Sequence, residues 1–263
     1  MNCTSIVKVY PRVAVTNELI IPLGEINQID SKDPEIIEIM DCEVIKSQNF
    51  EYRITCSVIK VVLIKPNIKL VLKPLINMEK IEDVKVLELS QHVVHYLPIN
   101  LGELFGNLTR LYASGCHLKE LKRANLKGLK NLEYMSLWMN DLETLPDDVF
   151  DDLINMKTLN LQGNKIKKIP EDIFQSLTKL QNVNLSRNKI RFIPAYLFTY
   201  NVDLENISLN DNLITYVSPR LLITLKKLKT CTFLRNTGIN EEAIRQRDII
   251  KLKAYLKLKF RNI

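Results

Sequence analysis

A strict 24-residue period, beginning at Val84, constrains the fold of this sequence more than any other feature. Seven consecutive blocks start at residues 84, 108, 132, 156, 180, 204 and 228, with no insertion or deletion between them. Three of the blocks read LEYMSLWMNDLETLPDDVFDDLIN, MKTLNLQGNKIKKIPEDIFQSLTK and LQNVNLSRNKIRFIPAYLFTYNVD. In these three, apolar residues occupy block positions 1, 4, 6, 11 and 14, asparagine position 9 and phenylalanine position 19. The period indicates a solenoid, because a single block cannot bury its own apolar face and must stack on its neighbours.

Each block is predicted to contain a short strand followed by a sharp turn. Positions 4 and 6 alternate as residues of a strand do, so both side chains point to one face. Strands of successive blocks are expected to lie parallel, about 4.8 Å apart, along one concave wall. The asparagine at position 9 lies at the turn, where its amide can satisfy backbone groups that would otherwise be buried unpaired. The predicted asparagine ladder consists of Asn140, Asn164, Asn188, Asn212 and Asn236, and His92 and Cys116 occupy the same position in the first two blocks.

This pattern resembles the leucine-rich repeat, specifically its typical 24-residue class, whose consensus is LxxLxLxxNxLxxLPxxxFxxLxx. The resemblance covers roughly residues 84–240. It implies an α/β repeat solenoid, the leucine-rich repeat horseshoe, with a short parallel strand per repeat on the concave face. It also implies an N-terminal cap and a helical C-terminal cap, since terminal repeats otherwise expose their cores.

In detail the chain resembles insect secreted leucine-rich repeat proteins. Ahead of the repeats it carries Cys42-Glu-Val and Tyr52-Arg-Ile-Thr-Cys56, and after them Asn236-Thr-Gly-Ile239. By this resemblance Cys42 and Cys56 form a disulfide; the alternative is two buried thiols. Gly238 stands where the family has a cap cysteine, and no cysteine follows it. We therefore expect no disulfide in the C-terminal cap.

Four segments are predicted along the chain. Residues 1–41 form an extension without periodicity, residues 42–83 the N-terminal cap, residues 84–240 the seven blocks (the last one partial), and residues 241–263 a basic C-terminal cap segment. In this last segment, apolar residues from Ile250 to Phe260 alternate with charge as in a strand. Asn240 followed by two glutamates is instead a helix-start signature, and we favour the helix. A basic amphipathic segment on a membrane surface is a further possibility.

Charge and motifs exclude several classes of function. Of the net charge of +7, residues 241–263 contribute seven basic minus three acidic side chains, or +4, which is not the pattern of a nucleic-acid-binding protein. No apolar run reaches eighteen residues, so no membrane span is expected. Gly-x-Ser-x-Gly, Walker and HExxH motifs are absent from the sequence, and the histidines lack metal-ligand spacing. We therefore predict no enzyme activity, catalytic residue, metal, cofactor or small-molecule substrate.

A binding patch is predicted on the concave face, where block positions 3, 5, 7 and 8 should be exposed. The only tryptophan of the chain lies at such a position in the third block. Aromatic residues with an arginine nearby are the composition of interface hot spots. The alternative is that the indole lies flat on its neighbours and covers part of the strand wall. The predicted partner-binding residues are Arg110, Tyr112, Tyr134, Trp138 and Met139.

The predicted function is a protein-binding leucine-rich repeat module, extracellular by family resemblance. Of four Asn-x-Ser/Thr triplets, beginning at Asn2, Asn107, Asn184 and Asn206, the last three are the glycosylation candidates. The alternative is a cytoplasmic scaffold or regulatory subunit that uses the same surface. The amino terminus supports this alternative, because it lacks the apolar core of a signal peptide.

Overall fold

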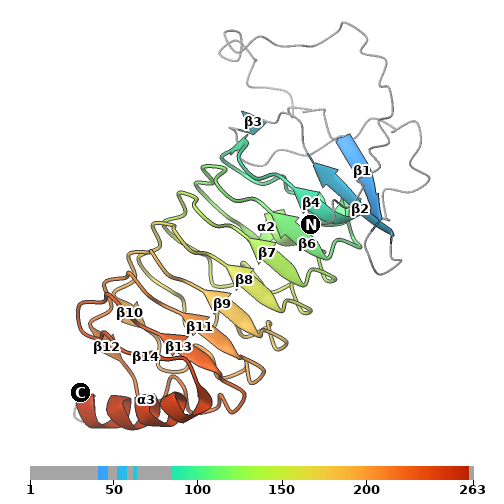
Figure 1. Ribbon diagram of the computed structural model, residues 1–263. Coiled ribbons are helices and arrows are strands. Elements are labelled where there is room, and N and C mark those ends of the chain that lie inside the picture. Colours follow the sequence, from blue (N-terminus) through green and yellow to red (C-terminus); the bar gives the residue numbers. More distant parts are fainter. Residues whose placement is uncertain (1–40, 47–51, 58–61, 64–83, 261–263) are drawn as a thin grey trace, which may run out of the picture.

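The computed structural model describes residues 41–46, 52–57, 62–63 and 84–260. The chain winds into a solenoid of stacked coils, with one short strand of each coil on a common wall (Figure 1). This confirms the predicted fold class. The predicted extension, residues 1–41, lies outside the described residues except for Asp41, and much of the predicted N-terminal cap lies outside them too.

The common wall is a ten-stranded sheet in the described part of the chain. It is parallel from β2 to β13 and antiparallel at the outermost pairs, β1–β2 and β13–β14. Strands of successive blocks pair with an offset of 24 residues, so that Leu111 lies opposite Met135. In spatial order the strands are β1 (Asp41–Lys46), β2 (Tyr52–Ser57), β4 (Val84–Glu88), β6 (Arg110–Tyr112), β7 (Tyr134–Ser136), β8 (Thr158–Asn160), β9 (Asn182–Asn184), β11 (Asn206–Ser208), β13 (Thr230–Thr232) and β14 (Glu242–Ala243).

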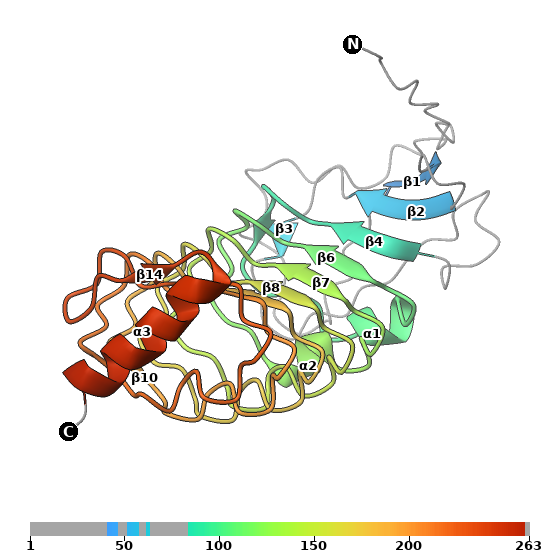
Figure 2. The same cartoon turned by 60° about the horizontal axis from the view of Figure 1, so that its bottom comes forward.

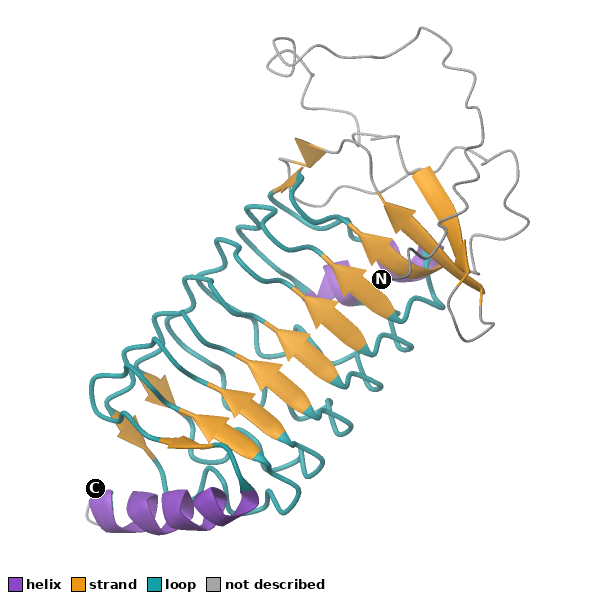
Figure 3. Cartoon of the chain, in the orientation of Figure 1, coloured by secondary structure: helices purple, strands orange, loops and turns teal. Residues whose placement is uncertain are grey.

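Loops and short elements make up the rest of each coil (Figure 3). Two helices of one turn, α1 (Leu101–Leu104) and α2 (Arg123–Leu126), lie in the first two blocks. Two small parallel pairs accompany the main sheet. They are β3 (Val62–Leu63) with β5 (Val93–Val94) and β10 (Phe192–Ile193) with β12 (Tyr216–Val217).

The core runs as a continuous column through the interior of the solenoid. Side chains at block positions 4 and 6, such as Leu159 and Leu161, are buried. The phenylalanines of position 19 stack face to face. Phe150 and Phe174 have ring centroids 6.2 Å apart, and Phe174 and Phe198 are 5.8 Å apart with their planes within 4°. Because each ring packs against the next block, burial is shared between neighbours rather than achieved within one repeat.

The asparagine side chains of position 9 connect neighbouring coils by hydrogen bonds. The Asn140 Oδ1 accepts from the backbone N–H groups of Cys116 and Leu118, both at 3.0 Å. Its Nδ2 donates to the carbonyls of Ala113 at 2.7 Å and Leu137 at 3.0 Å. Equivalent bonds join the later coils, because a turn without regular backbone pairing leaves such groups to be satisfied by side chains. They are made by Asn164, Asn188, Asn212 and Asn236.

Cys116 takes the donor part of this role in the second block. Its Sγ donates to the Leu89 carbonyl at 3.0 Å, as the Asn140 Nδ2 donates to the equivalent carbonyl one block later. The thiol is buried, and burial raises its pKa to about 11. A neutral thiol is a weak donor, yet its small size fits the column. Cys116 is thus a structural residue of the turn.

Helix α3 (Gln246–Lys259) closes the carboxy-terminal end of the stack (Figure 2). This confirms the helical C-terminal cap over the alternating strand. The buried residues Ile249, Leu252, Leu256 and Phe260 recur every three or four positions, whereas the exposed Ile250 and Leu258 lie on the outer face.

The expected helix start at Asn240 is wrong, because α3 begins six residues later. Glu242 and Ala243 form β14 and pair antiparallel with Thr232 and Cys231. The last parallel strand would otherwise present an unpaired edge, and β14 covers it. The Asn240 Oδ1 accepts from the backbone N–H of Arg235 at 2.7 Å, so this asparagine supports a turn rather than a helix cap.

Gly238 lies where the backbone of the last block meets the coil before it. Its N–H donates to the Ile214 carbonyl at 2.8 Å, and a Cβ at this position would lie 2.0 Å from the Thr215 carbonyl oxygen. Any larger residue would force the two coils apart. This close backbone contact accounts for the glycine at position 238.

At the other end, β1 and β2 pair antiparallel, with Cys42 directly opposite Cys56. Directly opposite residues of an antiparallel pair have Cα atoms about 4.5–5.5 Å apart, within the range that a disulfide requires. The two side chains themselves lie outside the described residues. The disulfide stays a prediction, supported by the backbone register.

Candidate protein-binding surface

The strands of the main sheet position the predicted binding residues. On β6 and β7, the position-4 residues Leu111 and Met135 point into the core and are fully buried. The residues on either side point out of the solenoid, because neighbours on a strand face opposite sides of the sheet. Arg110 and Tyr112 on β6 and Tyr134 on β7 are accordingly half-buried.

Two tyrosines and an arginine form one packed group on this wall. The rings of Tyr112 and Tyr134 have centroids 5.0 Å apart and are tilted by 40°. The Arg110 guanidinium lies 5.8 Å from the centroid of the Tyr134 ring, within the range of a cation–π contact. Partial burial raises the pKa of the Tyr134 hydroxyl, with the neighbouring Tyr112 adding to the effect. The phenol therefore stays neutral at physiological pH.

Trp138 and Met139 continue the group where the chain leaves β7. Their side chains are 43% and 51% exposed. The Trp138 carbonyl accepts from the Gly115 N–H at 2.8 Å, which links the backbone of Trp138 to the preceding block. The sulfur of Met139 lies over Gly163, where an added Cβ would be 2.9 Å away. We call the five predicted residues, Arg110, Tyr112, Tyr134, Trp138 and Met139, the aromatic patch.

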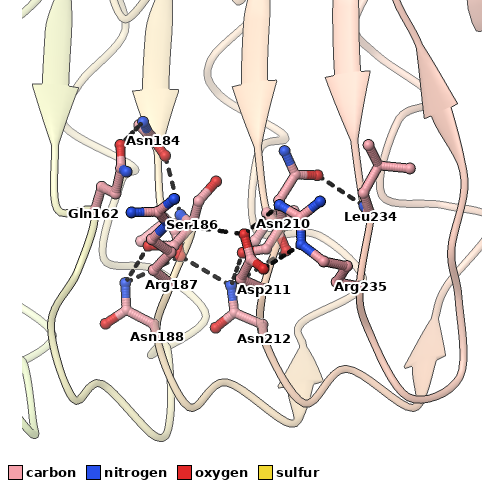
Figure 4. A network of polar contacts seen from close by, with 12 residues as sticks. Gln162, Asn184, Ser186, Arg187, Asn188, Asn210, Asp211, Asn212, Leu234 and Arg235 are labelled. Atoms are coloured by element: carbon pink, nitrogen blue, oxygen red, sulfur yellow. Dashed lines mark hydrogen bonds and ion pairs between the residues drawn. The ribbon is translucent and has the colours of Figure 1, made fainter.

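Polar side chains cover the wall from β8 to β13. At position 3, the Asn182 Nδ2 donates to Thr158 Oγ1 at 3.1 Å, and the Asn206 Nδ2 donates to Asn182 Oδ1 at 2.6 Å. The Thr230 hydroxyl donates to Asn206 Oδ1 at 2.7 Å. At positions 5 and 7, the Asn184 Nδ2 donates to Gln162 Oε1 at 2.8 Å (Figure 4). These polar groups form hydrogen bonds with one another across the strands. Many of them on this part of the wall therefore already have a partner within the protein.

A charged group borders this polar wall at block position 8. Asp211 lies between Arg187 and Arg235, and both arginines reach toward its carboxylate (Figure 4). The Arg235 Nη2 donates to Asp211 Oδ2 at 2.7 Å, and this hydrogen bond lowers the pKa of the carboxyl. Sequence reasoning placed these positions on the concave face and missed their pairing. The sequence signal for this pairing was the spacing of 24 residues between opposite charges at the same block position.

The backbone at position 8 is left-handed in every block. Its φ values lie between 55° and 71°. The expectation that positions 3, 5, 7 and 8 are all exposed is only partly met, since Val86, Ser136 and Ser186 are buried. The left-handed residues at position 8 are Gln91, Gly115, Met139, Gly163, Arg187, Asp211 and Arg235.

The glycosylation candidates differ in their surroundings. Asn107 is exposed on an outer loop, and its Oδ1 accepts from Asn131 Nδ2 at 3.3 Å. Asn184 and Asn206 are half-buried on β9 and β11, and their amide nitrogens donate to neighbouring side chains. A glycan on either of the last two would break a cross-strand bond. Of the three, Asn107 has the most accessible amide.

Neither a metal site nor a membrane helix is found in the described part of the chain. No group of three histidine, cysteine, aspartate or glutamate side chains is arranged to hold an ion there. Three aspartates of the third block, Asp148, Asp151 and Asp152, pair instead with Arg123, whose Nε donates to Asp152 Oδ1 at 3.0 Å. Within the same residues, no helix has the length and hydropathy needed to cross a bilayer.

Comparison with known proteins identifies the repeat. The family model of the leucine rich repeat matches residues 106–166, 130–190, 154–214 and 178–230. A leucine-rich repeat protein of Leptospira interrogans is 27% identical, with a TM-score of 0.57 over 75% of this chain and 47% of that one. TLR13, in its complex with ssRNA13, is 27% identical, with a TM-score of 0.53 over 56% of this chain and 22% of that one. This chain thus spans less than half the length of either protein. No curated protein sequence matches it.

Stacked coils with one parallel strand each define a solenoid repeat protein, a class in which each coil contacts mainly its neighbours. The 24-residue spacing, the asparagine ladder and the match to the family model specify the type of repeat within this class. Residues 106–230 of this chain are leucine-rich repeats with a spacing of about 24 residues. This fold is typical of protein-interaction scaffolds.

Proposed function

We propose that this chain binds a partner protein on the concave face of its solenoid, with the aromatic patch as the centre of the contact. The observation that carries the proposal is the exposure of Trp138 and Met139 beside a packed tyrosine pair. Aromatic residues and arginine dominate the energetics of protein interfaces. Strands β6 and β7 hold the packed tyrosine pair in place, so that little conformational entropy of these two side chains is lost on binding.

The charge of the wall favours a protein over a nucleic acid. Positions 3, 5, 7 and 8 of the seven blocks carry three arginines and two carboxylates, a net charge of +1. Binding to a phosphate backbone requires a pronounced excess of positive charge. The similar solenoid of TLR13 is seen in complex with an RNA, ssRNA13. Single-stranded RNA therefore belongs among the ligands tested.

An extracellular location is part of the proposal. It is supported by the register that sets Cys42 opposite Cys56 and by the accessible amide of Asn107. Disulfides persist in oxidising compartments and are rare in the cytosol. The alternative is a cytoplasmic scaffold that uses the same surface, in which both cysteines are free and Asn107 is unmodified.

The test is a binding screen of the full chain against secreted and cell-surface proteins, followed by Tyr134→Ala/Trp138→Ala. We expect this variant to keep its fold and to lose more than about 2 kcal/mol of binding energy, or roughly 30-fold in affinity. The matched control, Tyr200→Ala/Ile223→Ala, removes comparable exposed apolar surface from the outer loops. Equal affinity of the two variants for the partner would refute the concave site. Binding of single-stranded RNA in place of protein would refute the partner class.

A further inference from the structure

A second surface lies at the carboxy-terminal end of the solenoid, away from the aromatic patch. A hollow of about 650 Å³ separates the last turn of α3 from the loop that follows β12. It has the volume of a ligand cleft, which runs to roughly 300–1,000 Å³. The residues around it include Tyr216, Arg220, Lys257, Leu258 and Phe260.

The hollow combines aromatic walls with exposed apolar side chains. Tyr216 and Phe260 meet edge to face with centroids 5.0 Å apart. Phe192 stacks on the other side of Tyr216 at 6.4 Å and is 57% exposed, which extends the aromatic surface beyond the hollow. Leu258 is 77% exposed at its rim. Contiguous exposed apolar surface on a folded protein is typical of interaction sites.

The cations of the hollow lack carboxylate partners. Several exposed lysines elsewhere on the solenoid pair with an acidic residue one block away, as Lys157 does with Glu133 and Lys229 with Glu205. Among the residues that the structure describes, Arg220 and Lys257 form no ion pair, and the residues around the hollow include no carboxylate. Arg220 is instead held in place by Tyr196, whose hydroxyl accepts from its guanidinium and whose ring lies 5.6 Å from it.

We propose that this hollow, hereafter the cap groove, binds an acidic peptide segment of a partner protein. Carboxylates of the peptide pair with Arg220 and Lys257, and an apolar side chain between them packs on Tyr216, Phe260 and Leu258. Positive charge without local compensation favours a negatively charged ligand. An inward-curved site with rings on its walls fits inserted side chains, whereas a flat bilayer surface would leave the hollow unfilled. This second contact does not depend on the concave face.

The probe is a phage-displayed library of random short peptides, selected on the immobilised full chain. Selected peptides are then measured against Arg220→Glu/Lys257→Glu and against a matched control, Lys119→Glu/Lys130→Glu, which changes the net charge equally at exposed sites far from the groove. We expect a class of peptides rich in aspartate, glutamate and apolar residues. Its members should lose at least about 10-fold in affinity in the groove variant only. Leu258→Ser should weaken the same peptides without changing their salt dependence.

Three outcomes would overturn the proposal. In the first, no selected peptide separates the groove variant from its charge-matched control. In the second, the acidic peptides lose affinity in Tyr134→Ala/Trp138→Ala, which assigns them to the aromatic patch. In the third, vesicles of phosphatidylcholine and phosphatidylserine bind through Arg220 and Lys257 while no peptide does, which replaces the peptide by a lipid surface. Because the aromatic patch has its own variant, failure of either proposal leaves the other intact.

Discussion

Because the backbone at block position 8 is left-handed, the identity of the residue there affects the free energy of unfolding. Gly163 has a φ of +71°, and a Cβ there would lie 2.9 Å from Met139 Sδ. Gly115 has a φ of +64° and open space around it. We expect Gly115→Ala to lower the free energy of unfolding by about 1–2 kcal/mol through strain alone. Gly163→Ala should cost more, because the methionine must also move.

The measurement is urea-induced unfolding of both variants. Met139→Ala in the Gly163→Ala background should bring its stability back toward that of Gly115→Ala. Equal destabilisation of the two glycine variants, or no effect of the methionine change, would show that Met139 does not rest on Gly163.

The Cys116 thiol makes the free energy of unfolding depend on pH. The folded-state pKa of about 11 exceeds the ordinary thiol value of 9.0, which applies to the unfolded chain, because burial disfavours the thiolate. The protonated thiol is therefore stabilising below the unfolded pKa, and this stabilisation of roughly 2–3 kcal/mol is lost as pH rises through about 11. Cys116→Ser keeps a donor to the Leu89 carbonyl and does not titrate. Between pH 8 and 11 the wild type should lose more stability than the variant, and parallel stability–pH curves would contradict this.

At the scale of the element, α3 provides two leucines for comparison. Leu256 is fully buried against the last coil, whereas Leu258, two residues on, is 77% exposed. In a helix these residues lie on different faces, while in a strand both would share one. Leu256→Ala should lower the free energy of unfolding by about 2–5 kcal/mol, and Leu258→Ala by less than about 0.5 kcal/mol.

Thermal and urea unfolding followed by circular dichroism measure both variants. Loss of helix signal in Leu256→Ala before the rest of the molecule unfolds would show that the cap detaches as a unit. Equal costs at the two positions would contradict the packing of α3 described above.

At the scale of the whole molecule, we predict an extracellular location. In protein from its native cell type, non-reducing peptide mapping should show Cys42 linked to Cys56, with Cys116 and Cys231 as free thiols buried in the core. Glycan mass should appear on Asn107 first, because its amide is the most accessible of the three candidates. Free Cys42 and Cys56 together with a bare Asn107 would favour the cytoplasmic scaffold.

Much of this architecture could be predicted from the sequence because a solenoid repeats one local solution. Each coil contacts mainly its neighbours, so the 24-residue period alone specified the strand register, the buried positions 4 and 6 and the asparagine column. Leu111 pairs with Met135, 24 residues later in the chain, as the period predicts. The helical cap was also predictable, although its start was not. The strand β14 forms only because β13 has a free edge, which no local signal near Asn240 encodes.

The tertiary structure decided where side chains from different coils meet. The sequence placed Trp138 and Tyr134 on one wall, but the tilted contact between the rings of Tyr112 and Tyr134 depends on rotamers that a periodic pattern leaves open. The Arg187–Asp211–Arg235 group and the cap groove arise likewise from packing between coils, or between α3 and the last coil. Gly238 shows the same limit, since the missing cysteine was visible in the sequence and the close backbone approach that requires glycine was not. Periodicity determines which residues share a column, and only packing in three dimensions determines which atoms touch.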